Sequence, residues 1–574
     1  MIDVMPVKAG VLPAVAYLFE VLGMRKTIDS CVRWDESQCK LSPGARVKAL
    51  VLSCFMPARL PLCMMESAFS EYDVENLIHE GVRARDLTDD CLARALDKLV
   101  EAGAGKVLSS VLMGALRLEG VDISALHTDT TSISVYGEYL SDAAVNDDAF
   151  RIVLGFSKDH RPDLNQFKVG LFSTADGLPV LGDAFSGNTD DKTWNGSSIE
   201  RLREMAKEYE KVDLKKITYV ADSALVTKKN LRALSGEGGR AEKIYFLSRV
   251  PATFGIEQEV IQRAWQDNQW VDVGRVAEAK DAASYRYQLF HEEIDGIEYR
   301  LAVIHSSKLD KRKTKGIEKR IEALESELRK VCIALSKEEY VCAPDAEKAL
   351  MRFRKEHANP YFDIEGEVVE VVREKKREKR GRPQKGYVRE QEKVYQVISS
   401  PGPMNREAKA RAEEEASCFL LITNRMDEEW DGERMIREYK GQHCVETSFK
   451  FIKSPRYLNA IYLKNRERVE ALAYVIIMAL FIYQILQRRI RATLRERDTA
   501  LRYPNRDNKN PTSKAVVDIL DAGQVMFMRE GDRIRRVLGT RTQLFFEVLD
   551  LINIPKEAYI AVIPDPRRQL LKGG

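Results

Sequence analysis

Several features that would define a secreted or membrane-spanning protein are missing from this 574-residue sequence. The N-terminus, MIDVMPVKAG, lacks the basic start and apolar core of a signal peptide, so we expect no export. The longest apolar run, Ala471 to Tyr483, has 13 residues, which is too short for a bilayer span. We therefore expect a folded cytoplasmic protein with no membrane role.

Cysteine pairs and net charge are also scarce. The nine cysteines are odd in number and contain no CxxC pair, which argues against a disulfide framework or a zinc ribbon. The formal net charge is only +3, although the chain has 91 basic and 88 acidic residues. The basic residues gather in blocks at 311–315, 373–389 and 488–497. Local contact with a polyanion is therefore allowed, but the overall charge does not require it.

Apolar residues are plentiful, at 44%, and residues 1–120 place many of them at helical spacing. The length predicts three or more domains, or one core enlarged by insertions. The first of these is a helical N-terminal domain over 1–120. Helical domains of this size often bind DNA, but this one has no sharp helix-turn-helix signature, so binding of a DNA end is left open.

A different pattern begins at residue 121. Strand-like segments rich in Ile, Val and Thr alternate with two helical segments in the order β-β-β-α-β-α-β. The five strand segments are 121–139, 167–172, 178–182, 216–222 and 243–250. This order predicts an α/β core with a mixed five-stranded sheet and flanking helices, the ribonuclease-H-like arrangement.

Two aspartates occupy unusual places in these strands. Asp129 lies in the middle of the first strand, where alternation puts it on the same face as His127. Aspartate is depleted in strand interiors. Asp222 ends the fourth strand, at the edge where α/β sheets collect their ligands. The plain alternative for each is a turn or edge-strand acid.

The stretch YKGQHCVETSFKFIK, residues 439–453, is predicted to form one helix. Its polar residues at matching azimuth are Tyr439, Gln442, Glu446 and Lys453. The adjoining flank is apolar and comprises Val445, Phe449 and Ile452. Glu446 therefore lies at the edge of a packed face. A solvated surface charge is the ordinary alternative for a single helical Glu.

Taken together, Asp129, Asp222 and Glu446 resemble the acidic triad of DDE transposases with a ribonuclease-H-like core. The helix is similar to the Tyr-Arg-Glu-Lys signature of the insertion-sequence-four superfamily, with every spacing kept and Gln442 in place of Arg. The segments GFSKDHRPDLNQF, SGNTDDKT and VADSALVTKKNL add to this. With them, nearly the whole chain resembles the insertion-sequence sixteen-thirty-four family.

The resemblance implies a DNA transposase that cuts at the terminal inverted repeats of its insertion sequence and joins the 3' ends to target DNA. It implies that Asp129, Asp222 and Glu446 are catalytic and bind two Mg²⁺ ions, for which Mn²⁺ would substitute. The implied partners are double-stranded DNA and a second copy of the chain, forming a homodimer on paired ends. The expected location is the bacterial cytoplasm, in association with the nucleoid.

DNA contacts near the cut are implied for Tyr439, Gln442, Lys450 and Lys453. Gln442 can hydrogen-bond but lacks the charge and fork of Arg. A further DNA contact is predicted at Arg380-Gly381-Arg382-Pro383, which has the form of an AT-hook. Its Arg380 and Arg382 would enter a narrow A·T minor groove. A solvated basic hairpin tip is the alternative.

The expected layout divides the core. Residues 121–250 and 431–500 form the ribonuclease-H-like part, and residues 251–430 form a large α+β insertion domain between them. Within the insertion a helix carries a heptad seam: Ile317, Ile321, Leu324, Leu328, Val331 and Leu335. This seam packs in its own domain or, alternatively, dimerises.

The C-terminal part begins with a long helix from about 467 to 497, apolar in its first half and basic in its second. It would close the core and present four arginines to solvent or DNA: Arg488, Arg489, Arg491 and Arg495. Residues 501–574 are predicted to form a helical C-terminal region.

Two other functions remain open. One is a metal-dependent nuclease on the same fold without strand transfer, and the other is an inactive DNA-binding descendant. The intact acidic residues argue against the second. Terminal inverted repeats and short target duplications around the gene would separate transposase from nuclease.

Overall fold

The computed structural model describes most of the chain. The described residues are 3–57, 60–136, 139, 150–157, 161–209, 212–236, 241–276, 282–308, 311–374, 390–454, 463–530 and 533–565.

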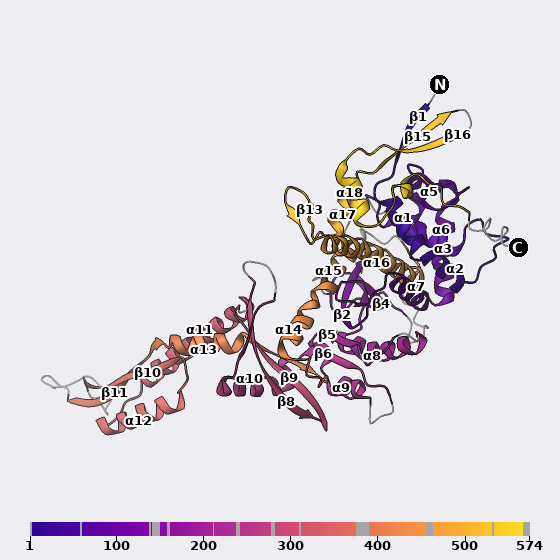
Figure 1. Cartoon of the computed structure of the whole chain (residues 1–574). Coiled ribbons are helices and arrows are strands. Elements are labelled where there is room, and N and C mark those ends of the chain that lie inside the picture. Colours follow the sequence, from indigo (N-terminus) through magenta and orange to yellow (C-terminus); the bar gives the residue numbers. More distant parts are fainter. Residues whose placement is uncertain are drawn as a thin grey trace, which may run out of the picture.

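A mixed sheet of nine strands organises the molecule, in the order β4-β3-β2-β5-β6-β12-β9-β8-β7 (Figure 1). In that order the strands are Pro179–Ser186, Asn165–Ser173, Ala125–Val135, Thr218–Ala221, Tyr245–Arg249, Cys418–Thr423, Ile297–Ser306, Ser284–Ile294 and Val271–Arg275. The central strands β2, β5 and β6 are parallel, and the other neighbours are antiparallel. The α/β class predicted from the sequence is confirmed.

The sheet is larger than the five strands predicted. The predicted strands are β2 to β6, and they lie together at one side of the sheet. Four more strands continue it, all from the region 251–430 that was assigned to a separate insertion domain. The sheet continues because β12 pairs with β6 along one edge and with β9 along the other. The edge of β6 is thereby covered.

Helices cover both faces of the sheet. Helix α8 lies on one face, where the Tyr219 hydroxyl of β5 donates to Asn195 Oδ1 of α8 at 2.9 Å. Helix α14 lies on the other face, where Val220 of β5 packs in one buried cluster with Ile436. The helices named here and below are α8 Asp191–Glu208, α9 Lys228–Ser235, α10 Ile256–Asp267, α14 Gly432–Gly441 and α15 His443–Ile452.

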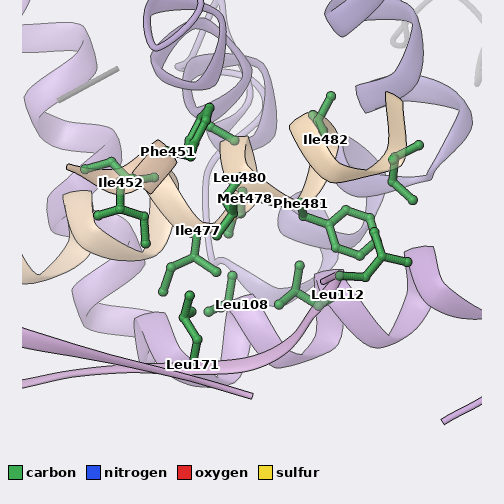
Figure 2. Close-up of a cluster of buried hydrophobic side chains, with 14 of the residues drawn as sticks. Leu108, Leu112, Leu171, Phe451, Ile452, Ile477, Met478, Leu480, Phe481 and Ile482 are labelled. Atoms are coloured by element: carbon green, nitrogen blue, oxygen red, sulfur yellow. The ribbon is translucent and has the colours of Figure 1, made fainter. Parts of the chain in front are cut away.

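The long helix α16, Arg466–Glu496, joins the sheet to the N-terminal helices (Figure 1). Figure 2 shows its Ile477 to Ile482 segment among Leu108 and Leu112 of α7, Leu171 of β3, and Phe451 of α15. By length and composition α16 could cross a membrane, but 89% of its apolar window is buried inside the protein. This is the burial of a core helix.

Two of the N-terminal helices begin at side-chain caps. Ser42 Oγ accepts from Ala45 N and Thr88 Oγ1 accepts from Cys91 N, both at 3.2 Å, as N-caps do. The helices are α1 Leu12–Val21, α2 Met24–Cys31, α3 Pro43–Ser53, α4 Met65–Phe69, α5 Val74–Leu77, α6 Asp89–Ala102 and α7 Ala104–Leu118.

Neither end of the chain is wholly helical, which corrects the prediction for 1–120 and 501–574. Strand β1, Asp3–Lys8, pairs with β15, Gln524–Glu530, and β15 pairs with β16, Arg533–Leu538. A short strand gives little signal when its partner lies at the other end of the chain. The C-terminal region also contains the short pair β13 Leu501–Arg502 and β14 Asp507–Asn508, and helices α17 Ser513–Leu520 and α18 Gln543–Leu551.

An arm projects from the sheet between β9 and β12 (Figure 1). It consists of α11 Lys311–Leu335, α12 Ala343–Glu356, β10 Phe362–Glu374, β11 Gln391–Met404 and α13 Arg406–Ala416. The heptad seam of α11 lies in the arm's own hydrophobic cluster, with Ile317 and Leu328 buried. The seam therefore packs within its own arm, which was the first of the two interpretations.

Candidate active site

Asp129 and Asp222 occupy matching positions on neighbouring parallel strands. The paired residues of β2 and β5 run from Ala125↔Thr218 to His127↔Val220. Both these pairs and the two aspartates differ by 93 positions (218 − 125 and 222 − 129). Asp222 follows directly after β5, so continuing the register by two residues brings it beside Asp129. Paired strands lie roughly 4.8 Å apart, which sets the scale of the backbone separation.

The two aspartates also point to the same face of the sheet. Side chains two residues apart on a strand share a face. Asp222 therefore shares the face of Val220, which packs against α14. Asp129 shares the face of His127, whose ring lies next to Gly441 at the end of α14. Both carboxylates thus lie under the α14–α15 segment, and both are half-buried.

The stretch 439–453 is not one continuous helix, which corrects the prediction. Helix α14 ends at Gly441 and α15 begins at His443, with Gln442 between them. The dihedrals of Gln442 stay helical, at φ −55° and ψ −22°, but the hydrogen bonds tighten. Gln442 N donates to Tyr439 O and Val445 N to Gln442 O, both three residues back. The apolar flank is buried as predicted: Val445, Phe449 and Ile452.

Gln442 ties this junction to the sheet. Its Nε2 donates to the carbonyl oxygen of Thr128 at 3.2 Å, directly beside Asp129. Glu446 follows one turn later, roughly 6 Å along the helix axis. Its side chain is exposed. Gln442, which was predicted to contact DNA, thus uses its side-chain amide to bind the strand that carries Asp129.

All three predicted carboxylates affect the pKa of Tyr439. Burial raises the pKa of its phenol, the nearby Arg249 guanidinium lowers it, and Asp222, Asp129 and Glu446 each raise it further. A negative charge opposes ionisation of a phenol only from nearby, so one side chain with these effects lies among all three acids. Tyr439 is therefore within electrostatic range of Asp129, Asp222 and Glu446.

Each aspartate also accepts a local backbone hydrogen bond. Asp129 Oδ1 accepts from Thr130 N at 2.7 Å, and Asp222 Oδ1 accepts from Ala224 N at 3.1 Å. Ser248 Oγ donates to the carbonyl oxygen of Asp222 at 2.7 Å. These bonds fix the backbone at the end of β5 and orient one oxygen of each carboxylate.

The donor chemistry of this site suits Mg²⁺, which prefers carboxylate oxygens and retains waters. Among the described residues, no group of three or more His, Cys, Asp or Glu side chains is arranged to hold a metal ion. The two aspartates fit as neighbours on one face, and Glu446 would have to approach from α15. Two-ion binding by Asp129, Asp222 and Glu446 stays a prediction.

Sequence reasoning missed Arg249. In the parallel register of β5 and β6, Ala221 pairs with Ser248, so Arg249 stands at the level of Asp222. Its guanidinium lies 5.4 Å from the Phe419 ring centroid, and that ring lies 6.4 Å from the Tyr439 ring. A cation therefore continues the row of acids on the next strand. The signal was an Arg at the end of the predicted strand 243–250, but its register is set only by the fold.

The remaining predicted DNA contacts have different surroundings. Lys450 is exposed on α15, and Lys453 is half-buried at the C-cap of that helix. Arg380 and Arg382 lie outside the described residues, although the strands β10 and β11 that flank them pair with each other.

Comparison with known protein families adds one finding. Residues 7–113 match a domain of unknown function, DUF4277. This stretch covers the end of β1 and helices α1 to α6, and it ends within α7, before β2 begins. Comparison with curated proteins finds no match. The fold and the site together define an α/β protein with two register-matched aspartates under a broken helix that carries a glutamate.

Proposed function

We propose that this protein is a DNA transposase that cuts at the terminal inverted repeats of its own insertion sequence and joins the 3' ends to target DNA. The observation that carries the proposal is the matched register of Asp129 and Asp222 on parallel strands. The segment that carries Glu446 packs over the same face. We propose that the strands in the order β4-β3-β2-β5-β6 form a ribonuclease-H-like core, which would be the catalytic unit.

Asp129, Asp222 and Glu446 would hold Mg²⁺, with Mn²⁺ as a substitute. When bound, a pair of such ions activates the attacking oxygen and stabilises the leaving oxygen in phosphodiester cleavage and strand transfer. The contribution of the chain would be to bring three carboxylates from separate elements to one phosphate. Carboxylates brought close together repel one another, so their approach to one site would be favoured by a bound cation.

The residues beside the acids would bind the DNA. Arg249 would pair with a non-bridging phosphate oxygen, and the Tyr439 phenol, kept protonated by its raised pKa, would donate a hydrogen bond to another. Lys450 and Lys453 would contact phosphates further along α15. Gln442 would act differently from the Arg of the superfamily, because its amide already holds the helix junction to β2.

Coordinated cutting of two ends requires two active sites. We therefore propose a symmetric homodimer on paired DNA ends in the bacterial cytoplasm, at the nucleoid. The hook at Arg380 and Arg382 would add minor-groove contacts from the arm.

A metal-dependent nuclease without strand transfer is the second candidate, because the same three acids would serve it. The test begins with the DNA that flanks the gene. Terminal inverted repeats with short target duplications supply the end substrate. Purified protein with that DNA and Mg²⁺ should give cleaved ends and, with target DNA, joined products. Cleavage without joining would indicate the nuclease, and no metal-dependent cleavage at all would overturn both.

A further inference from the structure

A second polar site lies on the other flank of the helix junction. A cavity of about 430 Å³ opens between α15 and the basic half of α16. The lining side chains that matter are Lys440, Thr447, Arg488, Arg491, Arg495 and Asp176. Four of these are cations and one is a carboxylate, so the cavity carries an excess of positive charge.

Three arginines of this cavity are already held in place. Arg488 forms an ion pair with Asp176. Arg491 Nε donates to the Pro511 carbonyl oxygen at 2.9 Å, which fixes its guanidinium at the cavity wall without neutralising it. Arg495 Nε donates to the Arg491 carbonyl oxygen at 3.2 Å. The cationic groups are thus positioned by neutral partners, apart from one ion pair.

The electrostatics of Arg491 favour an anion. Burial lowers the pKa of its guanidinium, and the charge of Arg495 lowers it further, while Asp176 raises it. Neighbouring cations in a half-buried site repel each other, and a bound anion relieves both costs. A phosphate group is small enough for the cavity and accepts several hydrogen bonds from arginine forks.

Arg489 separates this cavity from the general basic surface of α16. The sequence predicted that Arg489 would face solvent or DNA together with its three neighbours. Instead it pairs with Glu119 and donates to the Ile552 carbonyl oxygen at 3.3 Å. Three of the four arginines therefore belong to the cavity, and the fourth holds α16 to the rest of the protein.

The cavity is continuous with the candidate active site along the chain. Lys440 follows Tyr439, and Thr447 follows Glu446. Lys440 also lies 5.3 Å from the Tyr285 ring centroid and 5.8 Å from that of Phe419, the ring beside Arg249. The side chains of consecutive helical residues differ in direction by about 100°. The α14–α15 segment can therefore present one residue to the candidate active site and the next to the cavity. A strand bound at the acids would pass this cavity within a few nucleotides.

We propose that this cavity binds a backbone phosphate of the DNA strand that passes through the active site, near the cut. The proposal rests on the proposed function and adds a second anchoring point, formed by Lys440, Arg491 and Arg495. Its role is positioning: it would fix the direction in which the strand leaves Glu446.

The test is a salt titration of end-DNA binding by the full-length protein. The double variant Lys440→Gln/Arg495→Gln changes two exposed side chains. Each lost phosphate contact lowers the slope of log K against log salt by about 0.9. We expect a slope smaller by up to about two, weaker binding, and slower cleavage at saturating DNA.

The matched control is Arg497→Gln/Lys509→Gln, which removes two cations paired with Asp550 and Asp498 on exposed surface outside the cavity. It should keep the parental slope. If the parent cuts end DNA and both double variants share its slope, the cavity proposal is wrong and the proposed function stands. If the parent neither binds nor cuts end DNA, both fall.

A free anion is the other source of the same chemistry. Inorganic phosphate is the probe: calorimetric binding to the parent that is lost in Lys440→Gln/Arg495→Gln, with an unchanged DNA slope, would assign the cavity to a free anion. That outcome overturns the proposal. Phosphate competition that lowers DNA affinity in the parent more than in the double variant would support it.

Discussion

Replacing Gly441 by Ala tests whether the helix junction positions the site. The new Cβ would lie 2.9 Å from Cε1 and 3.2 Å from Nε2 of His127, where ordinary contact begins at 3.4 Å. His127 is fully buried, so its ring cannot turn away. The junction would therefore move by about 0.5 Å (3.4 − 2.9). Overpacking costs about 1–3 kcal/mol, and Ala in place of helical Gly returns about 1 kcal/mol.

The net change in unfolding free energy should thus stay within about 2 kcal/mol. The rate should suffer more, because a 1 Å misplacement of reacting groups costs roughly 100-fold. For half that shift we expect Mg²⁺-dependent cleavage of end DNA to fall roughly tenfold at saturating DNA. The assay is single-turnover cleavage of labelled end DNA, with urea unfolding measured on the same preparation.

Two variants control this experiment. Gly316→Ala lies in α11, where a new Cβ meets nothing within 4 Å. It should stabilise the arm by about 1 kcal/mol and leave cleavage unchanged. Adding His127→Ala to Gly441→Ala removes the obstructing ring and should restore part of the rate. A parental rate in Gly441→Ala would refute the positioning argument.

Further predictions concern the Glu20–Lys48 pair, Arg249 and the predicted hook. Lys48 is fully buried and paired with Glu20, so Glu20→Ala should cost about 3–5 kcal/mol in urea unfolding and Lys48→Met much less. Burial raises the pKa of Glu20, but the charges of Lys48 and Arg25 outweigh it and lower the pKa below its usual 4.5. The stability that the ionised Glu20 contributes should therefore be lost as the pH falls below 4.5. A destabilisation by Glu20→Gln that does not change with pH would contradict this. Arg249→Gln should slow cleavage roughly 10- to 100-fold with end binding little changed, and Arg249→Lys should recover part of the rate. Changing Arg380 and Arg382 to Ala should reduce the slope of log K for DNA binding against log salt by up to about two. Equal slopes for the variant and the parent would show that the predicted hook does not contact DNA.

The sequence predicted the elements of the core better than their partners. Periodicity located the strands β2 to β6 and the helical character of most of residues 1–120, because this signal is local. It did not reveal that β12 continues the sheet or that β1 pairs with β15. Pairing depends on contacts between distant segments, and alternation within one strand does not name its neighbour.

The candidate site divides in the same way. Asp129 was singled out because aspartate is unusual in a strand interior, and Asp222 because it ends a buried strand. The two aspartates are 93 positions apart, the same offset as the paired residues of β2 and β5. This agreement has no meaning until β2 and β5 are known to be parallel neighbours. Arg249 was missed for the same reason. The break at Gln442 was missed because helical spacing alone cannot distinguish bonds to the third residue from bonds to the fourth.

The most direct test of the central claim is Mg²⁺-dependent cleavage by Glu446→Gln, beside Asp129→Asn and Asp222→Asn. Each change keeps the size of the side chain and removes one carboxylate from the set proposed to hold the metal. We predict that each variant binds end DNA with parental affinity and keeps the parental free energy of unfolding in urea within about 1 kcal/mol, but cleaves at least 100-fold more slowly. A Glu446→Gln protein that cuts end DNA at the parental rate in Mg²⁺ would contradict the account.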